Sequence, residues 1–441
     1  ACAASGILPS PFNLFINLLE NEFHLSTSEP LGIRQEKLEA GFDKLSGHLD
    51  DAGRDILSDA LPLIGMLLQI PYPDPRIRLS GNELFVHIRM ALQSLIEIIL
   101  KTKLEQGKPV VLILDDLHWL DENSATVLGT ILQRIFRDEA MDLQDKILVL
   151  MQYRQDYTPP ESICGYAGFE ELELKPLGDI EIKRLIRLNT KDLNLPDELL
   201  DKVVKLSNGN PFYLEEWCSF LYEHPSQDLE NLPVPPNLHA LILSRLDLLE
   251  TSIRLLLQKA AVIGQEFFVD ILSWIEDKLF DPIDVSTTLA KLEHQAFILK
   301  LLGFDYSAYF FKHITTRDVA YHTLLLENRK ILHRLSAEAI EALYPQRQDE
   351  FLYPLAEHYH HADIPDKAIY YLEKAAAACK KNYCNKEALK YYHRLYTWLT
   401  QDPGQRKEPE QQFCPPPSIA RVLINIAEIN SLIGEWDETE T

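Results

Sequence analysis

A short, wholly apolar run constrains the fold of this chain more than any other feature. Residues 110–114 read VVLIL, an aliphatic stretch rich in β-branched residues, typical of a strand covered on both faces in a parallel sheet. A second such run, residues 147–151, follows a segment with helical spacing at about 124–137. Strand, helix and strand in this order predict an α/β domain with a doubly wound parallel sheet.

Helical spacing surrounds this unit. Apolar residues recur every three or four positions through residues 10–70 and along residues 84–99. Residues 169–177, FEELELKPL, alternate like an edge strand. Three helices predicted after them would form a helical lid, at about 179–190, 197–207 and 211–223. A proline-bearing linker near residues 225–236 predicts a domain boundary.

Beyond the linker the pattern predicts a winged helix. Helices at about 237–249, 251–263 and 285–294 precede two apolar runs that flank residues 303–307 in the manner of a β-hairpin. Three helices followed by a hairpin are the elements of a winged-helix domain.

From about residue 350 the chain repeats a pattern of paired helices. Setting Ala368 at position 20 of a 34-residue tetratricopeptide (TPR) frame places small and large residues on its core positions: Leu355, Ala356, Tyr359, Ala368, Leu372 and Ala375. Residues 434–439, GEWDET, look like the turn before another repeat helix. Tyrosines at 370, 371, 391 and 392 either line a ligand groove or pack between helices.

These patterns predict a multidomain α/β plus α protein. The expected domains are an α/β core at 1–175, a lid at 176–232, a winged-helix-like domain at 233–345 and an incomplete TPR-like α-solenoid at 346–441.

Charge and composition exclude several classes of function. The 67 acidic and 43 basic residues give a net charge of −24, which disfavours nucleic acid and anionic lipid as partners. The longest apolar run, residues 61–70, is about half a membrane span, so no membrane segment is expected. Six cysteines without a C-x-x-C pair favour a reducing, cytoplasmic location, with neither a disulfide framework nor a zinc site.

Two acids follow the first apolar run. At the carboxyl end of a strand in an open α/β sheet, Asp115 could hold a hydrated Mg²⁺ ion while Asp116 orients water at a phosphate. The alternative is that the two acids only form a turn and cap the next helix.

The surrounding residues, VVLILDDLHWLDENS, resemble the Walker B region of the STAND class of signal-transducing ATPases, which are relatives of the AAA+ ATPases. The resemblance implies that Asp115 binds magnesium and that Asp116 orients the attacking water. His118, Trp119 and Asp121 complete the motif. Core packing is the alternative role for Trp119.

Three further residues match landmarks of the same family. Arg154, the last residue of the run ILVLMQYR, lies at the place of a sensor arginine, with a plain salt bridge as the alternative. SNGNPFYLEEW resembles the lid motif, which implies nucleotide contacts for Gly209 and Pro211; a helix stop and start explains both without a ligand. His313 matches a phosphate-sensing histidine, with helix capping or half-buried packing as the alternative.

A phosphate cradle is missing from the sequence. No G-x-x-x-x-G-K-[ST] motif occurs, and the only Gly-Lys pair, Gly107 and Lys108, precedes a proline and a strand. Because the family's P-loop lies upstream of a segment like residues 2–19, we expect a fragment that lacks the first strand and P-loop and is cut at both ends. A degenerate ATPase that lost the motif is the alternative.

The resemblance covers nearly the whole chain and implies a regulatory ATP-binding or ATPase switch with ATP and Mg²⁺ as cofactors. The expected parent is a large cytoplasmic signalling protein with an upstream output domain, a class III nucleotide cyclase or a protein kinase. A protein partner is expected on the TPR-like repeats. The alternatives are a non-catalytic interaction scaffold and a LuxR-type transcription regulator, whose weak basic face would comprise Lys312, Arg317, Arg329, Lys330 and Arg334.

Overall fold

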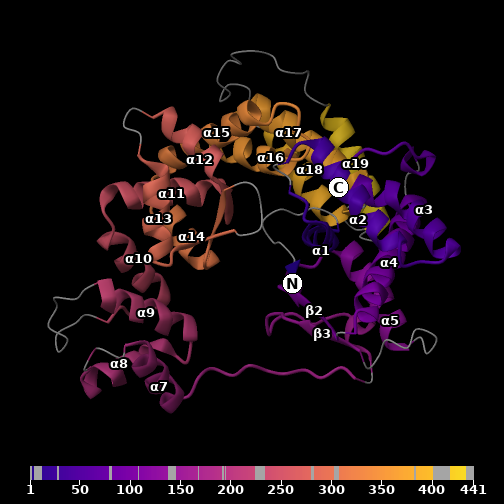
Figure 1. Cartoon of the computed structure of the whole chain (residues 1–441). Coiled ribbons are helices and arrows are strands. Elements are labelled where there is room, and N and C mark those ends of the chain that lie inside the picture. The colour runs from indigo at the N-terminus through magenta and orange to yellow at the C-terminus, as the bar shows by residue number, and fades with distance from the viewer. Residues whose placement is uncertain are drawn as a thin grey trace. The chain divides into compact units, whose positions relative to one another are not determined.

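The computed structural model describes most of the chain. The described residues are 2–3, 12–26, 29–78, 82–107, 109–137, 146–166, 168–190, 193, 195–223, 234–279, 283–301, 307–381, 384–400 and 418–433. They form two compact units (Figure 1). Unit 1 comprises Ala1–Glu171, Gly303–Asp305 and Tyr344–Thr441, and unit 2 comprises Leu172–Leu302 and Tyr306–Leu343. The expected linker, hairpin turn and final GEWDET segment lie largely outside the described residues.

Unit 1 contains a small parallel sheet. Strands β1 (Cys2–Ala3), β2 (Val110–Asp115) and β3 (Ile147–Met151) lie in that order, and both neighbouring pairs are parallel. Helix α5 (Glu122–Arg137) connects β2 to β3, so the predicted strand-helix-strand unit is present. Further helices contribute to the same apolar core: α1 (Asn13–Phe23), α2 (Leu31–Ser46), α3 (Asp51–Leu67), α4 (Asn82–Glu105) and α6 (Glu161–Cys164). Short 3₁₀ turns, η1 (Pro75–Arg78) and η2 (Leu117–Trp119), complete this part.

Two expectations about the sheet are wrong. The strands were predicted to be covered on both faces, but Val111 is 51% exposed and Leu148 53% exposed, while Leu114 and Ile147 are buried. Successive side chains of a strand point to opposite faces, so the described helices cover one face only. Residues 169–177 form no strand, because an alternating pattern needs a neighbouring strand to pair with; Leu172 there is 83% exposed.

The last helices of unit 1 stack in order. Helices α16 (Leu352–His361), α17 (Pro365–Lys381), α18 (Asn385–Thr400) and α19 (Ile419–Ile433) each contact the next one along the chain. The residues that the repeat frame assigns to the core are all buried: Leu355, Ala356, Tyr359, Ala368, Leu372 and Ala375. Tyr371, Tyr391 and Tyr392 are buried as well, which favours helix packing over a ligand groove for these tyrosines.

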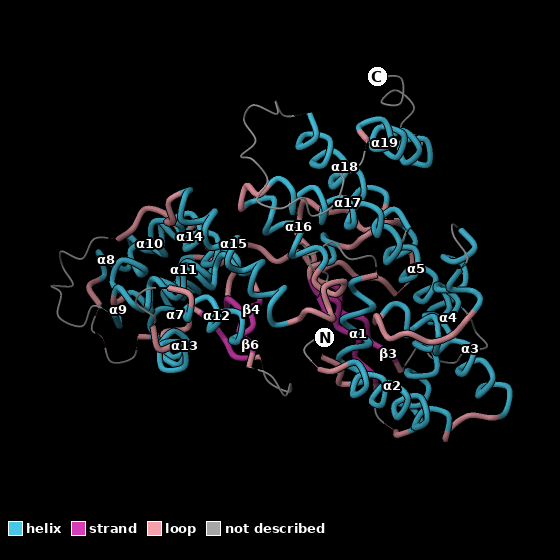
Figure 2. Tube along the Cα trace, turned by 90° about the horizontal axis from the view of Figure 1, so that it is seen from above, coloured by secondary structure: helices cyan, strands magenta, loops and turns pink. Residues whose placement is uncertain are grey.

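Unit 2 has two apolar cores. Helices α7 (Asp179–Asn189), α8 (Asp197–Ser207) and α9 (Pro211–Glu223) pack around Trp217, close to the bounds predicted from the sequence. The second core joins helices to a three-stranded antiparallel sheet of order β4-β6-β5 (Figure 2). The strands are β4 (Glu266–Phe268), β5 (Ile298–Lys300) and β6 (Ala308–Phe311). The helices of this part are α10 (Leu238–Leu248), α11 (Thr251–Ile263), α12 (Val269–Asp277), α13 (Val285–His294), α14 (Ile314–His322) and α15 (Leu326–Leu343).

Among the described helices, none combines the length and the apolar character that crossing a membrane requires.

Candidate functional site

The acid pair lies at the carboxyl edge of the parallel sheet. Asp115 is the last residue of β2, and its Oδ1 accepts a hydrogen bond of 2.9 Å from the backbone N–H of Asp116. The chain then turns sharply, because Asp116 has φ 54° and ψ 37° in the left-handed region. The Leu117 N–H donates to the Gln152 carbonyl, at 3.0 Å, so the turn is fixed against the end of β3. Aspartate tolerates this backbone region better than most residues, and such strained positions cluster at functional sites.

Charged and polar groups gather around Asp116. Partial burial and the neighbouring carboxylate of Asp115 raise the pKa of Asp116, whereas His118 and Arg154 act to lower it. The Nδ1 atom of His118 lies 3.9 Å from Asp116 Oδ1. The His118 side chain is only 10% exposed, and neither ring nitrogen has a hydrogen-bond partner among the described residues. Two carboxylates, an imidazole and a guanidinium therefore share one edge of the sheet.

Arg154 lies close enough to the acid pair for its charge to act on the pKa of Asp116. Arg154 follows β3, and its guanidinium carbon lies 6.0 Å from the centroid of the Trp119 ring. No ion pair joins Arg154 to another described residue, so the salt-bridge alternative has no support there. Trp119 is 47% exposed, so the alternative that it packs in the core is wrong.

Asp121, the last acid of the motif, has a structural role. Its Oδ1 accepts a hydrogen bond from the Ser124 N–H at 2.9 Å, and its Oδ2 accepts one from the Ser124 hydroxyl at 2.5 Å. Both bonds cap the start of α5. Burial raises the Asp121 pKa. The capping role considered for the acid pair therefore belongs to Asp121.

The predicted lid residues lie in unit 2. Gly209 has φ +76°, and a Cβ added there would lie 2.5 Å from Pro176 Cβ, so glycine is required for two reasons. The Gly209 carbonyl accepts a hydrogen bond from Leu177 N–H at 3.0 Å, and Pro211 is the first residue of α9. These contacts agree with the helix stop and start that local structure alone demands.

His313 lies beside the start of α9. Its ring centroid is 3.7 Å from that of Phe212, the residue after Pro211. Burial and Lys312 lower its pKa, and its Nε2 atom has no hydrogen-bond partner among the described residues. His313 precedes α14 without capping it through its side chain, so the helix-cap alternative is wrong and the packing alternative fits. Unit 2 thus places His313 against Phe212, the residue after Pro211, while Asp115, Asp116 and Arg154 lie in unit 1.

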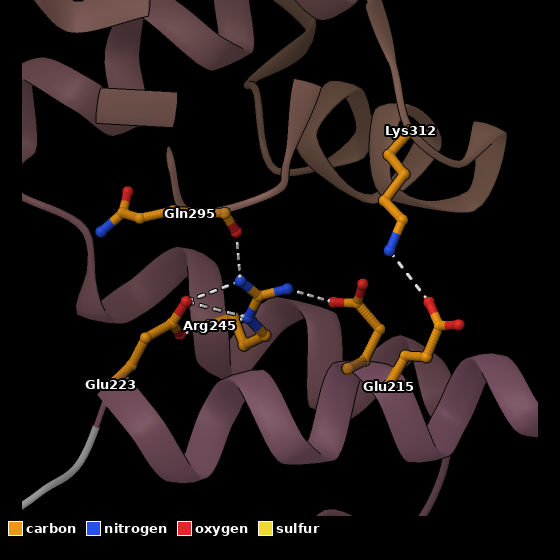
Figure 3. Close-up of polar contacts among 6 residues, drawn as sticks. Glu215, Glu223, Arg245, Gln295 and Lys312 are labelled. Atoms are coloured by element: carbon orange, nitrogen blue, oxygen red, sulfur yellow. Dashed lines mark hydrogen bonds and ion pairs between the residues drawn. The ribbon is translucent and has the colours of Figure 1, made fainter. Parts of the chain in front are cut away.

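Sequence reasoning missed a buried charge cluster in unit 2. Arg245 of α10 is 1% exposed and forms ion pairs with Glu216 and Glu223 of α9 (Figure 3). It also donates to the Gln295 carbonyl at 2.8 Å, and its guanidinium lies 4.3 Å from the Phe297 ring centroid. Nearby, Lys312 Nζ is 2.9 Å from Glu215 Oε2. A charged residue within the apolar helix LHALILSRLDL was the available signal.

The acid pair fits a hydrated magnesium ion, because carboxylate oxygens at a strand end are ligands this ion accepts. The rest of a nucleotide site is less complete. Gly107, with φ +77°, follows α4 and precedes β2, so its backbone does not open a helix around a phosphate. No group of three potential metal ligands among His, Cys, Asp and Glu occurs in the described part of the chain.

Comparisons with known proteins give limited relationships. No known family model matches the chain. The chain is 24% identical over 269 residues to the uncharacterized protein R02095 of Rhizobium meliloti, and the match covers 59% of this chain and 25% of that protein. The chain thus spans about a quarter of the length of this relative.

Among solved structures, the chain is similar to a STAND protein with a tetratricopeptide repeat sensor, PH0952 from Pyrococcus horikoshii. The TM-score is 0.37 at 14% identity, over 87% of this chain and 66% of that one. A superposition this loose carries no argument about fold or activity.

Proposed function

We propose that this chain is a regulatory nucleotide-binding switch module of a signalling protein. The observation that carries the proposal is the arrangement at the carboxyl edge of the parallel sheet, where Asp115 ends β2, Asp116 follows it and Arg154 follows β3. Ligands of open α/β sheets bind at this edge. ATP with Mg²⁺ is the proposed ligand.

Each residue at the edge has a proposed role. Asp115 would hold the magnesium ion through water, and a bound magnesium ion supplies charge neutralisation at the phosphates. The Asp116 carboxylate would accept a hydrogen bond from the attacking water and orient it. Arg154 would place positive charge near the phosphates, and its electrostatic effect on Asp116 supports this proximity.

Other parts of the chain would read the state of the nucleotide. We assign Gly209, Pro211 and His313 to an adenine- and phosphate-sensing site, supported by the contact between Phe212 and His313. The antiparallel-sheet part of unit 2 would be the winged helix. The stacked helices α16–α19 would be TPR-like repeats that bind a protein partner. The proposed parent is a cytoplasmic protein whose upstream output domain is a class III nucleotide cyclase or a protein kinase.

Titration calorimetry with Mg-ATP tests this function on the chain itself. We expect binding weaker than micromolar, because the sequence contains no P-loop motif to cradle the phosphates. Asp115→Asn should weaken it further, whereas Asp156→Asn, an exposed carboxylate near the same edge, should not. Equal binding by the chain and Asp115→Asn would contradict the proposed magnesium site. Micromolar affinity in the unchanged chain would reveal a phosphate site of another kind.

One observation favours a second candidate, the interaction scaffold. The sequence lacks the P-loop motif although the acid pair is present, as expected of an ATPase that lost its chemistry and kept its repeats. By contrast, three of the five residues of the basic face expected of a transcription regulator are engaged internally. Lys312 pairs with Glu215, Arg317 donates to the Ala261 carbonyl, and Arg329 donates to the Leu324 carbonyl.

A further inference from the structure

The repeat helices contact the second half of the acidic motif. Lys386, in the first turn of α18, has its Nζ 2.5 Å from Oε1 of Glu122, the first residue of α5. Asn123 follows in α5, and its Nδ2 lies 3.8 Å from the Cys384 Sγ just before α18. The helices that meet are 261 residues apart in sequence at this contact, yet both belong to unit 1.

The two halves of the motif are joined by a short, hydrogen-bonded segment. Asp116 begins the turn, and the Trp119 N–H donates to the Asp116 carbonyl at 2.9 Å. The Leu120 N–H donates to the Leu117 carbonyl at 3.0 Å, and Asp121 then caps α5. Five residues therefore separate the contact with α18, at Glu122, from the acid pair. These hydrogen bonds hold the described residues between the two sites, so a displacement at the start of α5 would be passed on to the acidic turn.

A second contact, located away from the acidic motif, holds the repeat helices to the rest of unit 1. Arg34 of α2 is 2% exposed, lies 3.3 Å from Glu350 just before α16, and donates to the Leu68 carbonyl at 2.6 Å. Glu350 also pairs with Arg347 at 2.6 Å. Breaking a buried ion pair leaves an uncompensated charge and is costly. The buried contact is therefore the anchor, whereas the exposed pair Glu122–Lys386 is weak and easily changed.

We propose that the acidic motif is a relay between the repeats and the nucleotide site: Asp115 and Asp116 face the ligand, and Glu122 and Asn123 face α18. A partner that moves the repeats would shift the start of α5 and thereby the conformation of the acid pair. The proposal rests on the proposed function, since it names the regulation of the same site. The reciprocal effect is required by linkage, so a ligand at the acid pair would alter how firmly α18 is held.

Hydrogen–deuterium exchange of the full chain tests the relay. Lys386→Glu places two carboxylates together. Amide exchange should then become faster at the start of α18, at the start of α5 and in the acidic turn, residues 115–120. The increase should be up to about fivefold, which is the size expected from the loss of an exposed ion pair. The charge swap Glu122→Lys with Lys386→Glu should restore slow exchange. Lys390→Glu, the same change one turn further along α18 at an exposed lysine, is the matched control and should leave the acidic turn unchanged.

The outcomes separate the relay from the function on which it rests. Faster exchange at α18 with an unchanged acidic turn would overturn the relay, as would equal effects of Lys386→Glu and Lys390→Glu. Unchanged exchange everywhere in Lys386→Glu would overturn the contact itself. Mg-ATP titration of the same proteins reports on the site: failure to bind refutes the proposed function even where exchange shows the two elements coupled.

Discussion

At the scale of single residues, the residue type that would be most stable at a position can differ from the one that a functional site needs. Asp116 occupies the left-handed backbone region at the end of a strand, and its pKa is raised by burial and by Asp115. A stability-driven sequence would place asparagine or glycine here, since both accept positive φ without a charge. The carboxylate therefore stands at a position where it costs stability, as is common at functional sites.

This reasoning predicts that Asp116→Asn is as stable as the unchanged chain or slightly more stable at neutral pH. A raised pKa means that the folded chain binds the proton more tightly, so this contribution to stability is present at low pH and is lost as the pH rises through the folded pKa. Because asparagine carries no charge, Asp116→Asn avoids this loss of stability at high pH. The gain should stay below about 1 kcal/mol because the side chain is half exposed. Thermal unfolding at pH 4 and 7 measures it.

The control for this variant is Asp116→Ala. It removes the same charge, but alanine has no polar side-chain group that could form a local hydrogen bond. Holding such a residue at positive φ costs about 1–2 kcal/mol. If Asn destabilises the chain as much as Ala at pH 7, the carboxylate itself holds the turn, and the acid pair is only a turn after a strand.

Arg245 provides a second prediction at this scale. Arg245→Met leaves Glu216 and Glu223 without their cation in the interior of unit 2, and losing one partner of a buried ion pair costs about 3–5 kcal/mol. Arg254→Met removes the surface pair with Asp247 and should cost under about 1 kcal/mol. Denaturant unfolding compares the two variants. Similar small losses in both would show that Arg245 does not hold α9 to α10.

At the scale of elements, the sequence predicted those set by local pattern and missed those set by distant partners. The runs at 110–114 and 147–151 became β2 and β3, and the lid helices α7, α8 and α9 have bounds within one residue of those expected. Residues 169–177 had the pattern of a strand without a neighbour to pair with. Exposure of Val111 and Leu148 depends on what covers the sheet, which periodicity does not encode.

The repeat register is the element-scale prediction. Ala368 of α17 is fully buried between stacked helices, so Ala368→Leu should overpack this contact and cost about 1–3 kcal/mol. Ala377→Leu, on an exposed face of the same helix, should change stability little. A thermal midpoint that is unchanged in Ala368→Leu would show that the register is wrong.

At the scale of the whole molecule, the chain forms two units, and each holds part of the predicted site. Asp115, Asp116 and Arg154 belong to unit 1, and Gly209, Pro211 and His313 belong to unit 2. Sequence motifs identified these residues. No motif predicted that α16–α19 would join the sheet in unit 1, because the contacts Arg34–Glu350 and Glu122–Lys386 link segments that share no local pattern. The division of the chain into four domains remains a prediction.

Manganese relaxation tests the central claim most directly. Mn²⁺ replaces Mg²⁺ at oxygen sites and broadens the amide signals of nearby residues. The account predicts selective broadening around Asp115–Trp119 and Arg154, lost in Asp115→Asn and retained in the exposed control Asp156→Asn. Broadening that is absent from this edge of the sheet, or that persists unchanged in Asp115→Asn, would contradict it and leave the acid pair without a metal to hold.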